Sequence, residues 1–184
     1  MAKYICPWWL AYTFDNPFRK LVHNPVRMLS PYVTPGMVVA DIGCGMGFFS
    51  IGLAMIVGKS GRVLAVDLQE EMFKRVRKRA AKAGVTDIVR PRICSANSVG
   101  LDDESLDFGL AFWMVHETPD AGRFYDQMFA ALRTSGKLLV AEPKFHVSRK
   151  AFELSIHVAQ EKGFRIFERP DVFWSYGVVM EKES

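Results

Sequence analysis

The sequence predicts an α/β fold, a doubly wound and mostly parallel sheet of seven strands with an antiparallel C-terminal hairpin. From Gly36 onward, short apolar runs alternate with helical patterns, which is typical of parallel strands buried on both faces. Near the end of the chain, only a short turn at Pro170-Asp171 separates two strand patterns. So short a link requires the two strands to pair antiparallel.

The individual elements are predicted in chain order from their apolar patterns and boundary residues. Pro91 weakens the third strand or places it at a sheet edge, because proline has no N–H for the ladder. Gly84 suits the left-handed residue that follows the end of a helix. Strands are expected at 37–42, 62–67, 88–94, 105–113, 136–142, 164–169 and 172–181, and helices at 47–57, 69–83, 121–132 and 148–162.

The bulk composition fits one globular domain over residues 1–184. The 184 residues are 49% hydrophobic and 24% charged, and the formal net charge is +4. The basic residues of 74–82 follow a helical pattern, so we interpret them as a solvated helix face; a surface for RNA or an acidic partner is the alternative. We therefore expect no nucleic-acid partner.

The cysteines Cys6, Cys44 and Cys94 are widely spaced and form no CxxC pair. This spacing argues against a disulfide framework or a zinc site and favours a reducing, cytoplasmic compartment. The histidines share no ligand-like spacing with acidic residues, so no metal site is predicted. No apolar run is long enough to span a membrane, and Pro7 interrupts the stretch that could mimic a signal segment.

A buried strand, an acidic residue and a glycine-rich turn that opens a helix follow one another within Val39–Ser50. Glycine lacks a Cβ and tolerates positive φ, so Gly43, Gly45 and Gly47 allow a ligand to touch the backbone. The helix that follows directs free N–H groups and its positive dipole end toward the same place. These features predict a cofactor site.

The glycine spacing and two aspartates restrict the class of cofactor. Dinucleotide binders use G-x-G-x-x-G, but Phe48 stands at the third glycine position, and no lysine follows the glycines as a P-loop requires. Asp41 disfavours a pyrophosphate and suits a cationic or amide group. Asp67, at the end of the second strand, can accept both hydroxyls of a ribose; capping the next helix is its structural alternative. S-adenosylmethionine combines a ribose with a zwitterionic end and therefore fits.

The same residues resemble motif I of class I S-adenosylmethionine-dependent methyltransferases, and 63–67 is similar to the acidic-loop motif that follows it. Residues 106–117 resemble the strand-four motif of the small-molecule branch, which includes ubiquinone and menaquinone methyltransferases. Residues 132–140 resemble the turn into strand five. The similarity covers roughly 33–181 in the family's order, and it implies a Rossmann-like fold.

The resemblance also implies which residues bind S-adenosylmethionine and its product S-adenosylhomocysteine. The glycine turn would hold the methionine end, Asp67 would bind the ribose, and residues at the following strand ends would complete the site. Ser95 stands where the family has an acidic residue for the adenine amine, which leaves that contact to Asn97 or to the Ala96 backbone. The implied cofactor-binding set is Asp41, Gly43, Cys44, Gly45, Gly47, Asp67, Leu68, Met72, Ser95, Ala96, Asn97 and Phe112.

Residues after strands four and five are the candidates for the chemistry. Methyl transfer from a sulfonium depends mainly on positioning and exclusion of water, so no catalytic residue is compulsory. His116 is the best candidate for a general base, because histidine ordinarily titrates near neutral pH, and Glu142 is the second catalytic candidate. A structural role is the alternative for both. Trp113 and His116 are expected to contact the acceptor, a small apolar or aromatic molecule.

The first thirty residues are rich in aromatic side chains and are divided by prolines into short helical pieces. We expect 1–30 to form a cap or lid over the cofactor and the acceptor, with 31–184 as the catalytic core. As pocket residues, the lid would contribute Tyr12 and Phe14. Simple packing on the sheet and a membrane-interface anchor through Trp8 and Trp9 are the alternatives.

Other functions stay open at this point. An NAD(P)-dependent oxidoreductase would share the fold, although Phe48 argues against it. A non-catalytic, methyltransferase-like binding subunit is left open by the missing acidic residue at Ser95. The cysteines also invite comparison with arsenite methyltransferases, but Cys44 belongs to the glycine turn and Cys94 to a strand end.

Overall fold

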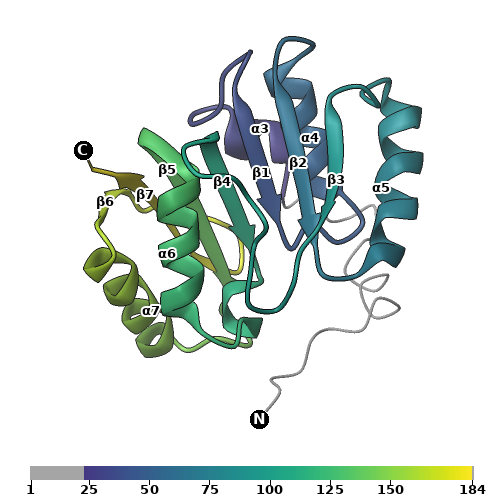
Figure 1. Ribbon diagram of the computed structural model, residues 1–184. Coiled ribbons are helices and arrows are strands. Elements are labelled where there is room, and N and C mark those ends of the chain that lie inside the picture. Colours follow the sequence, from purple (N-terminus) through teal and green to yellow (C-terminus); the bar gives the residue numbers. More distant parts are fainter. Residues whose placement is uncertain (1–22, 184) are drawn as a thin grey trace.

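A computed structural model describes residues 23–183 of the chain, which form a seven-stranded sheet in the order β3-β2-β1-β4-β5-β7-β6 (Figure 1). The five strands β1 to β5 run parallel. Strand β7 lies antiparallel to both β5 and β6. The predicted doubly wound sheet with an antiparallel C-terminal hairpin is therefore confirmed. Its strand order reverses between β1 and β4, where ligands bind in such sheets.

The helices and strands follow the predicted order. Residues 1–22, which include Tyr12 and Phe14, lie outside the described part of the chain. The elements are α3 (Pro25–Leu29), β1 (Val38–Ile42), α4 (Phe48–Val57), β2 (Arg62–Asp67), α5 (Glu70–Ala83), β3 (Val89–Ile93), β4 (Leu106–Phe112), the 3-10 helix η1 (Val115–Glu117), α6 (Ala121–Ala131), β5 (Leu132–Pro143), α7 (Arg149–Glu161), β6 (Phe164–Glu168) and β7 (Ser175–Lys182).

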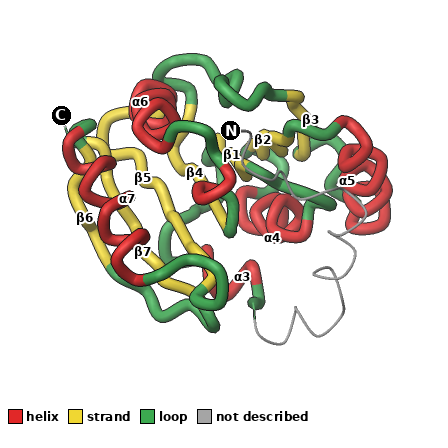
Figure 2. Tube along the Cα trace, turned by 90° about the horizontal axis from the view of Figure 1, so that it is seen from below, coloured by secondary structure: helices red, strands yellow, loops and turns green. Residues whose placement is uncertain are grey.

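Helices cover both faces of the sheet, and a separate core lies under each layer. Figure 2 shows α4 and α5 on one side and α6 and α7 on the other. On the α4 side, α3 packs so closely that a Cβ added to Gly52 would lie 2.3 Å from the Cβ of Pro25. The described part of the predicted cap is therefore a short helix packed on α4.

Two local predictions about boundary residues are confirmed. Strand β3 lies at the edge of the sheet, as Pro91 indicates, because the residue cannot donate to a second neighbour. Gly84 follows the last residue of α5 with a φ of 69°, the left-handed conformation expected there.

Some strand boundaries differ from the prediction. Strand β5 begins at Leu132, which already pairs with Leu106, and the register then shifts around Ser135, whose φ is 63°. Strand β7 begins only at Ser175, so the connection from β6 is longer than a turn at Pro170-Asp171. The sequence also did not predict η1, because a single 3-10 turn has no apolar period.

Candidate active site

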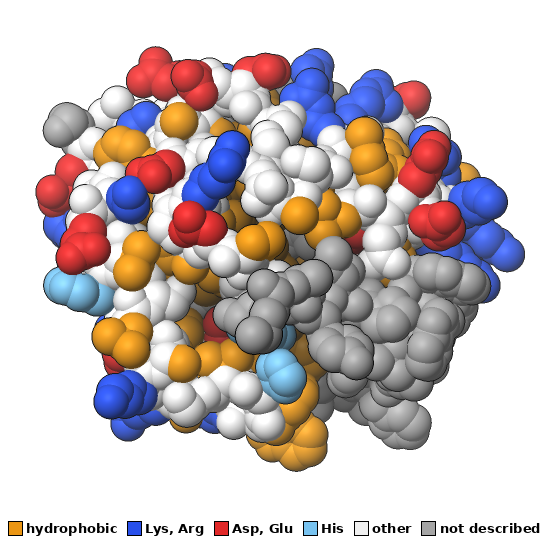
Figure 3. All heavy atoms as spheres, turned by 60° about the horizontal axis from the view of Figure 1, so that its bottom comes forward, with side chains coloured by type: hydrophobic (Ala, Val, Ile, Leu, Met, Phe, Trp, Pro, Cys, Tyr) orange, Lys and Arg blue, Asp and Glu red, His pale blue; other side chains and the backbone are white. Residues whose placement is uncertain are grey.

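Most of the predicted site residues that the structure describes lie at or just beyond the ends of β1 to β5. Parallel pairing brings Ile42 beside both Val66 and Ala111, so these carboxyl ends meet at one edge of the sheet. Figure 3 looks onto this end of the molecule, where hydrophobic side chains and a histidine gather. The sheet thereby assembles one site from residues far apart in the sequence.

The three glycines of the turn have left-handed φ values and different surroundings. A Cβ at Gly43 would lie 2.9 Å from the Cβ of Met114, and one at Gly47 would lie 3.1 Å from Cγ2 of Val76. A Cβ at Gly45, where φ is 50°, would meet no atom of residues 23–183 within 4 Å. Gly43 and Gly47 are therefore needed for close packing, whereas Gly45 presents its backbone to open space.

The carboxylate of Asp67 is bound to the glycine turn. One oxygen accepts a hydrogen bond from the Gly45 N–H at 2.8 Å, and the other accepts one from the Gln69 N–H at 3.0 Å. Burial raises the pKa of Asp67, and these N–H groups act in the opposite direction. Gln69 is the N-cap of α5, so Asp67 supports the residue before the helix and does not itself cap it.

Asp41 and Cys44 are buried beneath the turn. The Ser50 hydroxyl donates to Asp41 at 2.5 Å, and the Cys44 N–H donates to the Val66 carbonyl at 3.0 Å. Burial, followed by the charges of Asp41 and Asp67, raises the pKa of the Cys44 thiol. Burial likewise raises the pKa of Cys94 to about 11. Burial therefore disfavours the thiolate form of both cysteines, which is the reactive form of the side chain.

Across 23–183, no group of three or more His, Cys, Asp or Glu side chains is arranged to hold a metal ion.

The remaining residues that were predicted to bind the cofactor, some of them around its adenine, fall into an exposed and a buried group. Leu68 is 36% exposed next to Asp67, and Ser95, Ala96 and Asn97 are exposed just beyond β3. The Cys94 N–H donates to the Asp67 carbonyl at 3.0 Å, which joins this loop to the end of β2.

Two predicted cofactor residues are buried. Met72 lies in the first turn of α5 and is 4% exposed. Phe112 packs on Phe49 with 4.4 Å between the ring centroids and belongs to the core on the α4 side.

His116 and Glu142 come together at the ends of β4 and β5. Glu142 is 3% exposed; its Oε1 accepts hydrogen bonds from the N–H groups of Val115 at 2.8 Å and His116 at 3.3 Å. Its Oε2 contacts Nδ1 of His116. The other ring nitrogen, Nε2, lies 4.0 Å from Oε1 of Glu117. Buried Glu142 therefore fixes both the backbone of η1 and the orientation of the His116 ring.

Trp113 is held on the opposite side of the same strand end. Its φ is 60°, and its indole N–H donates to the Ser175 hydroxyl at 2.8 Å. Ser175 is 3% exposed and donates in turn to the Phe173 carbonyl at 3.2 Å. The Trp113 ring also packs edge-on against Phe145, at 5.4 Å between centroids.

Exposed aromatic side chains extend this surface. Phe145 is 62% exposed, Phe173 48% and Trp174 65%. Phe173 and Trp174 stack at 5.1 Å, and the Trp174 carbonyl accepts from the Lys144 N–H at 2.9 Å. We call Trp113, Phe145, Phe173 and Trp174 the aromatic wall. Only Trp113 was predicted, because the other three lie on loops that strand patterns do not place.

The fold and the site together define a class of protein. An open doubly wound sheet has a glycine turn after β1 and a carboxylate after β2, and the two are joined by the hydrogen bond from Gly45 to Asp67. Among the described residues, the space beside Gly45 suits the amino-acid portion of a nucleoside-containing cofactor. The Asp67 oxygens suit its ribose, and exposed Leu68 suits its base. This is the arrangement of class I S-adenosylmethionine-dependent methyltransferases.

Comparisons with known proteins agree with that class. The profile of the methyltransferase domain family matches residues 33–169. A demethylmenaquinone methyltransferase of Desulfitobacterium hafniense is 29% identical over 130 residues, which cover 71% of this chain and 49% of that protein. An arsenite methyltransferase of Halobacterium salinarum is 29% identical over 110 residues, which cover 60% of this chain and 28% of that protein. The chain thus spans half or less of the length of these relatives.

Solved structures share the fold. A SAM-dependent methyltransferase from Aquifex aeolicus superimposes with a TM-score of 0.84 at 23% identity, over 96% of this chain and 99% of that one. The chain therefore belongs to the methyltransferase domain family, and its cofactor is S-adenosylmethionine. This membership argues against the nicotinamide oxidoreductase alternative. Within 23–183, no helix has the length and apolar character needed to cross a membrane.

Proposed function

We propose that this protein transfers a methyl group from S-adenosylmethionine to a small aromatic or apolar acceptor, with His116 as the general base. The observation that carries the proposal is the pairing of His116 with the buried carboxylate of Glu142. A family resemblance alone predicts the donor, but this pair adds a group able to remove a proton from an acceptor. It lies at the strand ends where the cofactor site is also assembled.

The geometry of the pair fixes the protonation pattern of the imidazole. An ionised carboxylate only accepts hydrogen bonds, so Nδ1 of His116 donates to Glu142. In the neutral ring, Nε2 then carries the free lone pair and is the basic atom. Glu142 is buried and bound to two backbone N–H groups, so its role is to position His116 and stabilise the imidazolium, while His116 contacts the acceptor.

The residues of the cofactor site would hold S-adenosylmethionine as the sequence predicts. Asp67 would accept the ribose hydroxyls, the Gly45 backbone would face the methionine portion, and Leu68 would pack on the base. When bound, S-adenosylmethionine supplies an electrophilic methyl group. Ser95, Ala96 and Asn97 complete the proposed base pocket, and buried Asp41, Cys44, Met72 and Phe112 support it from below.

The aromatic wall supports an apolar or aromatic acceptor. Trp113 is restrained by Ser175 and backed by Phe145, so it offers a flat surface that is already in place before binding. The name of the Desulfitobacterium relative, a demethylmenaquinone methyltransferase, is consistent with a ring-shaped acceptor here.

The N-terminal cap is part of the same proposal. His23, the first described residue, packs edge-on against Trp113 with 5.6 Å between the ring centroids. The chain thus enters the described fold beside the aromatic wall, which supports the role of 1–30 as a lid that brings Tyr12 and Phe14 to the acceptor.

Two measurements on the purified full chain test the proposal. Titration calorimetry with S-adenosylhomocysteine and with NADH should show binding of the former only. Methyl transfer from a labelled donor should then be detected with a panel of phenols, naphthols and reduced quinones, and not with arsenite. His116→Ala should lower kcat roughly 10²- to 10⁴-fold, as expected for loss of a general base.

His157→Ala is the matched control, because His157 lies exposed on α7, where it pairs with Glu161. Binding of S-adenosylhomocysteine without turnover on any acceptor would favour the non-catalytic alternative. Turnover unchanged in His116→Ala would remove the general base from the mechanism.

A further inference from the structure

The connection between β3 and β4 carries part of the proposed base pocket but has little support of its own. It spans 94–105 and contains no helix, although the other crossovers of the parallel sheet do. Ser95 and Ser98 exchange backbone hydrogen bonds at 3.0 and 3.1 Å, which closes a small turn at its start. Residues 95–98 are exposed, so packing alone does not fix this turn.

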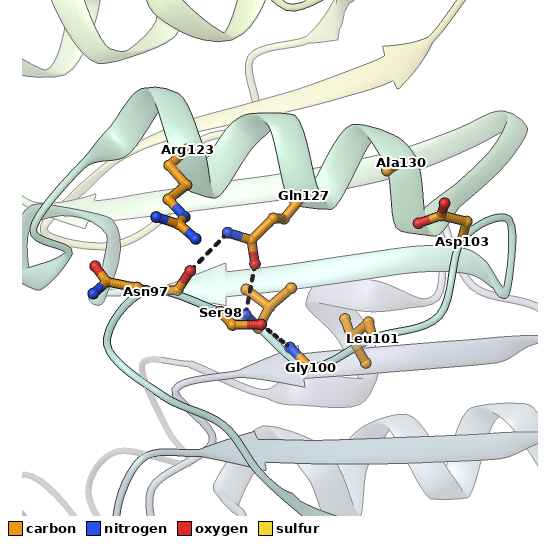
Figure 4. Close-up of a pocket in the computed structure, with 9 residues that line it drawn as sticks. Asn97, Ser98, Gly100, Leu101, Asp103, Arg123, Gln127 and Ala130 are labelled. Carbon is orange, nitrogen blue, oxygen red and sulfur yellow. Dashed lines mark hydrogen bonds between the residues drawn. The ribbon is translucent and has the colours of Figure 1, made fainter.

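One side chain from α6 holds the turn. Gln127 accepts a hydrogen bond from the Val99 N–H at 2.8 Å and donates one to the Asn97 carbonyl at 3.0 Å. Figure 4 shows Gln127 reaching from the helix to the loop between these two backbone groups. A carboxamide can make both bonds at once, because it has an acceptor oxygen and a donor nitrogen.

The space around Gln127 is otherwise poorly filled. A hollow of about 290 Å³ separates the loop from α6. It is lined by Asn97, Ser98, Val99, Gly100, Leu101, Asp103, Arg123, Gln127 and Ala130. Val99 is buried in the core, and Arg92 donates to the Gly100 carbonyl at 2.9 Å. Gln127 adds the hydrogen bond to the exposed Asn97 at the tip of the turn.

The same turn is connected directly to the ribose-binding residue. The Cys94 N–H donates to the Asp67 carbonyl at 3.0 Å, and Ser95 follows immediately. Cys94, which bonds to Asp67, is therefore close in the chain to Asn97, which bonds to Gln127. A shift of the turn would move its polar groups relative to the base of a bound nucleoside, while the glycine turn would stay in place.

We propose that Gln127 is a positioning residue for the adenine end of the cofactor. It holds Ser95, Ala96 and Asn97 in the arrangement that contacts the polar edge of adenine. It thereby sets the affinity for the cofactor and the preference for adenine over other bases. This inference rests on the proposed function, because it assumes that a nucleoside cofactor binds beside these residues. Gln127 itself does not touch the cofactor and acts through the loop.

Three substitutions of Gln127 test the two hydrogen bonds. Gln127→Ala removes both. Gln127→Glu keeps an acceptor for the Val99 N–H but turns a negative charge toward the Asn97 carbonyl. Gln127→Leu retains the bulk without either bond. Gln160→Ala on α7 is the matched control, since Gln160 is exposed and far along the chain from the loop.

The test uses the full chain and two ligands, S-adenosylhomocysteine and its hypoxanthine analogue S-inosylhomocysteine. Loss of two hydrogen bonds should weaken S-adenosylhomocysteine binding roughly tenfold in Gln127→Ala and Gln127→Leu. The preference for adenine over hypoxanthine should fall at the same time, and kcat at saturating donor should stay within about twofold. A general loss of fold would instead reduce kcat and both affinities alike.

Hydrogen exchange of the Val99 amide gives an independent measurement without any ligand. It should become faster in Gln127→Ala and Gln127→Leu and stay protected in Gln160→Ala. If the parent chain fails to bind S-adenosylhomocysteine, the proposed function is wrong. If the parent binds and the Gln127 variants match it in affinity, base preference and Val99 protection, only the role of Gln127 is overturned.

Discussion

The proposed cofactor side and the proposed acceptor side of this site are built in different ways. On the cofactor side, the glycine turn and Asp67 belong to consecutive strands, and the hydrogen bond from Gly45 joins residues 22 positions apart. On the acceptor side, Trp113 depends on Ser175, 62 positions away, and His116 depends on Glu142, 26 positions away. Both regions need the folded sheet, but the residues of the first belong to motifs that can be recognised in the sequence, whereas the supporting partners of the second do not.

The two sides also differ in which residue types adopt a left-handed backbone conformation. The left-handed residues of the cofactor turn are glycines, which adopt positive φ with no steric penalty. On the acceptor side, Trp113 and Trp174 have φ values of 60° and 52°. Bulky side chains rarely adopt this conformation, and tertiary hydrogen bonds hold both residues in it. The acceptor side should therefore be more sensitive to substitutions at distant supporting residues.

The largest effect is expected from removal of the buried carboxylate on the acceptor side. Glu142→Ala leaves the N–H groups of Val115 and His116 without their acceptor and releases the His116 ring. We expect kcat to fall roughly 10²- to 10⁴-fold and the free energy of unfolding to fall by about 2 kcal/mol. Steady-state kinetics and urea unfolding measure the two effects.

Glu117→Ala is the control for this change. Its carboxylate lies 4.0 Å from Nε2 of His116 and is partly exposed, so its loss should have a much smaller effect. Binding of S-adenosylhomocysteine should be retained in both variants, because the cofactor side is built independently. Equal losses of cofactor affinity and kcat in Glu142→Ala would mean that the two sides are not separable.

The second prediction concerns the cofactor side. Asp67→Ala removes the proposed acceptor of the ribose hydroxyls and the partner of the Gly45 N–H. Loss of two charged hydrogen bonds should weaken S-adenosylhomocysteine binding on the order of 100-fold. Calorimetry measures this, with Asp87→Ala, an exposed aspartate in the α5–β3 turn, as the control. Unchanged affinity in Asp67→Ala would contradict the ribose assignment.

A smaller effect is expected where the acceptor side depends on a single distant hydroxyl. Ser175→Ala removes the partner of the buried Trp113 indole N–H. The acceptor KM should rise about tenfold, while the affinity for S-adenosylhomocysteine stays the same.

Ser155→Ala is the matched control for that change, because this hydroxyl pairs with Tyr125 and lies away from the aromatic wall. It should affect stability without raising KM. If the two serine variants behave alike, the position of Trp113 does not determine acceptor binding.

The last prediction is the pH dependence of cofactor binding. Burial raises the pKa of Asp67 above the ordinary value of an aspartate, so the carboxylate takes up its proton at a higher pH than an exposed aspartate does. The proposed ribose contact would use the charged form of Asp67. The affinity for S-adenosylhomocysteine should therefore weaken as the pH falls through this raised pKa, by about tenfold per pH unit below it.

Calorimetry over the acidic range in which the protein stays folded measures this effect. In Asp67→Ala the affinity should be low and nearly independent of pH over the same range. A wild-type affinity that stays constant across it would show that the charge of Asp67 is not used.

The sequence predicted the elements that carry the proposed cofactor side, and the binding roles of their residues stay predictions. The order of the strands along the chain, the left-handed glycines and the place of Asp67 at a strand end follow from local patterns and from the geometry of parallel sheets. Met72 and Phe112 were placed in the correct elements, but a sequence does not show how deeply a side chain is buried.

On the acceptor side the prediction was partial. His116, Glu142 and Trp113 were identified because they follow strands four and five. Ser175, the hydrogen-bond partner of Trp113, was missed because it was assigned to the interior of a strand. Gln127 was missed because one glutamine in an amphipathic helix resembles any solvated residue. Phe173 and Trp174 were assigned to the start of the last strand, whereas the structure places them in the connection before β7.

By itself, the sequence determined the α/β class, the order of the strands and the nature of the methyl donor. Apolar periodicity, glycine conformation and the position of carboxylates after strands are local properties, which short-range sterics and burial impose on each segment. The tertiary structure alone decided how His116 is oriented, what holds Trp113 and how the β3–β4 loop is fixed. Each of these depends on a hydrogen bond between residues that only the folded sheet brings within reach.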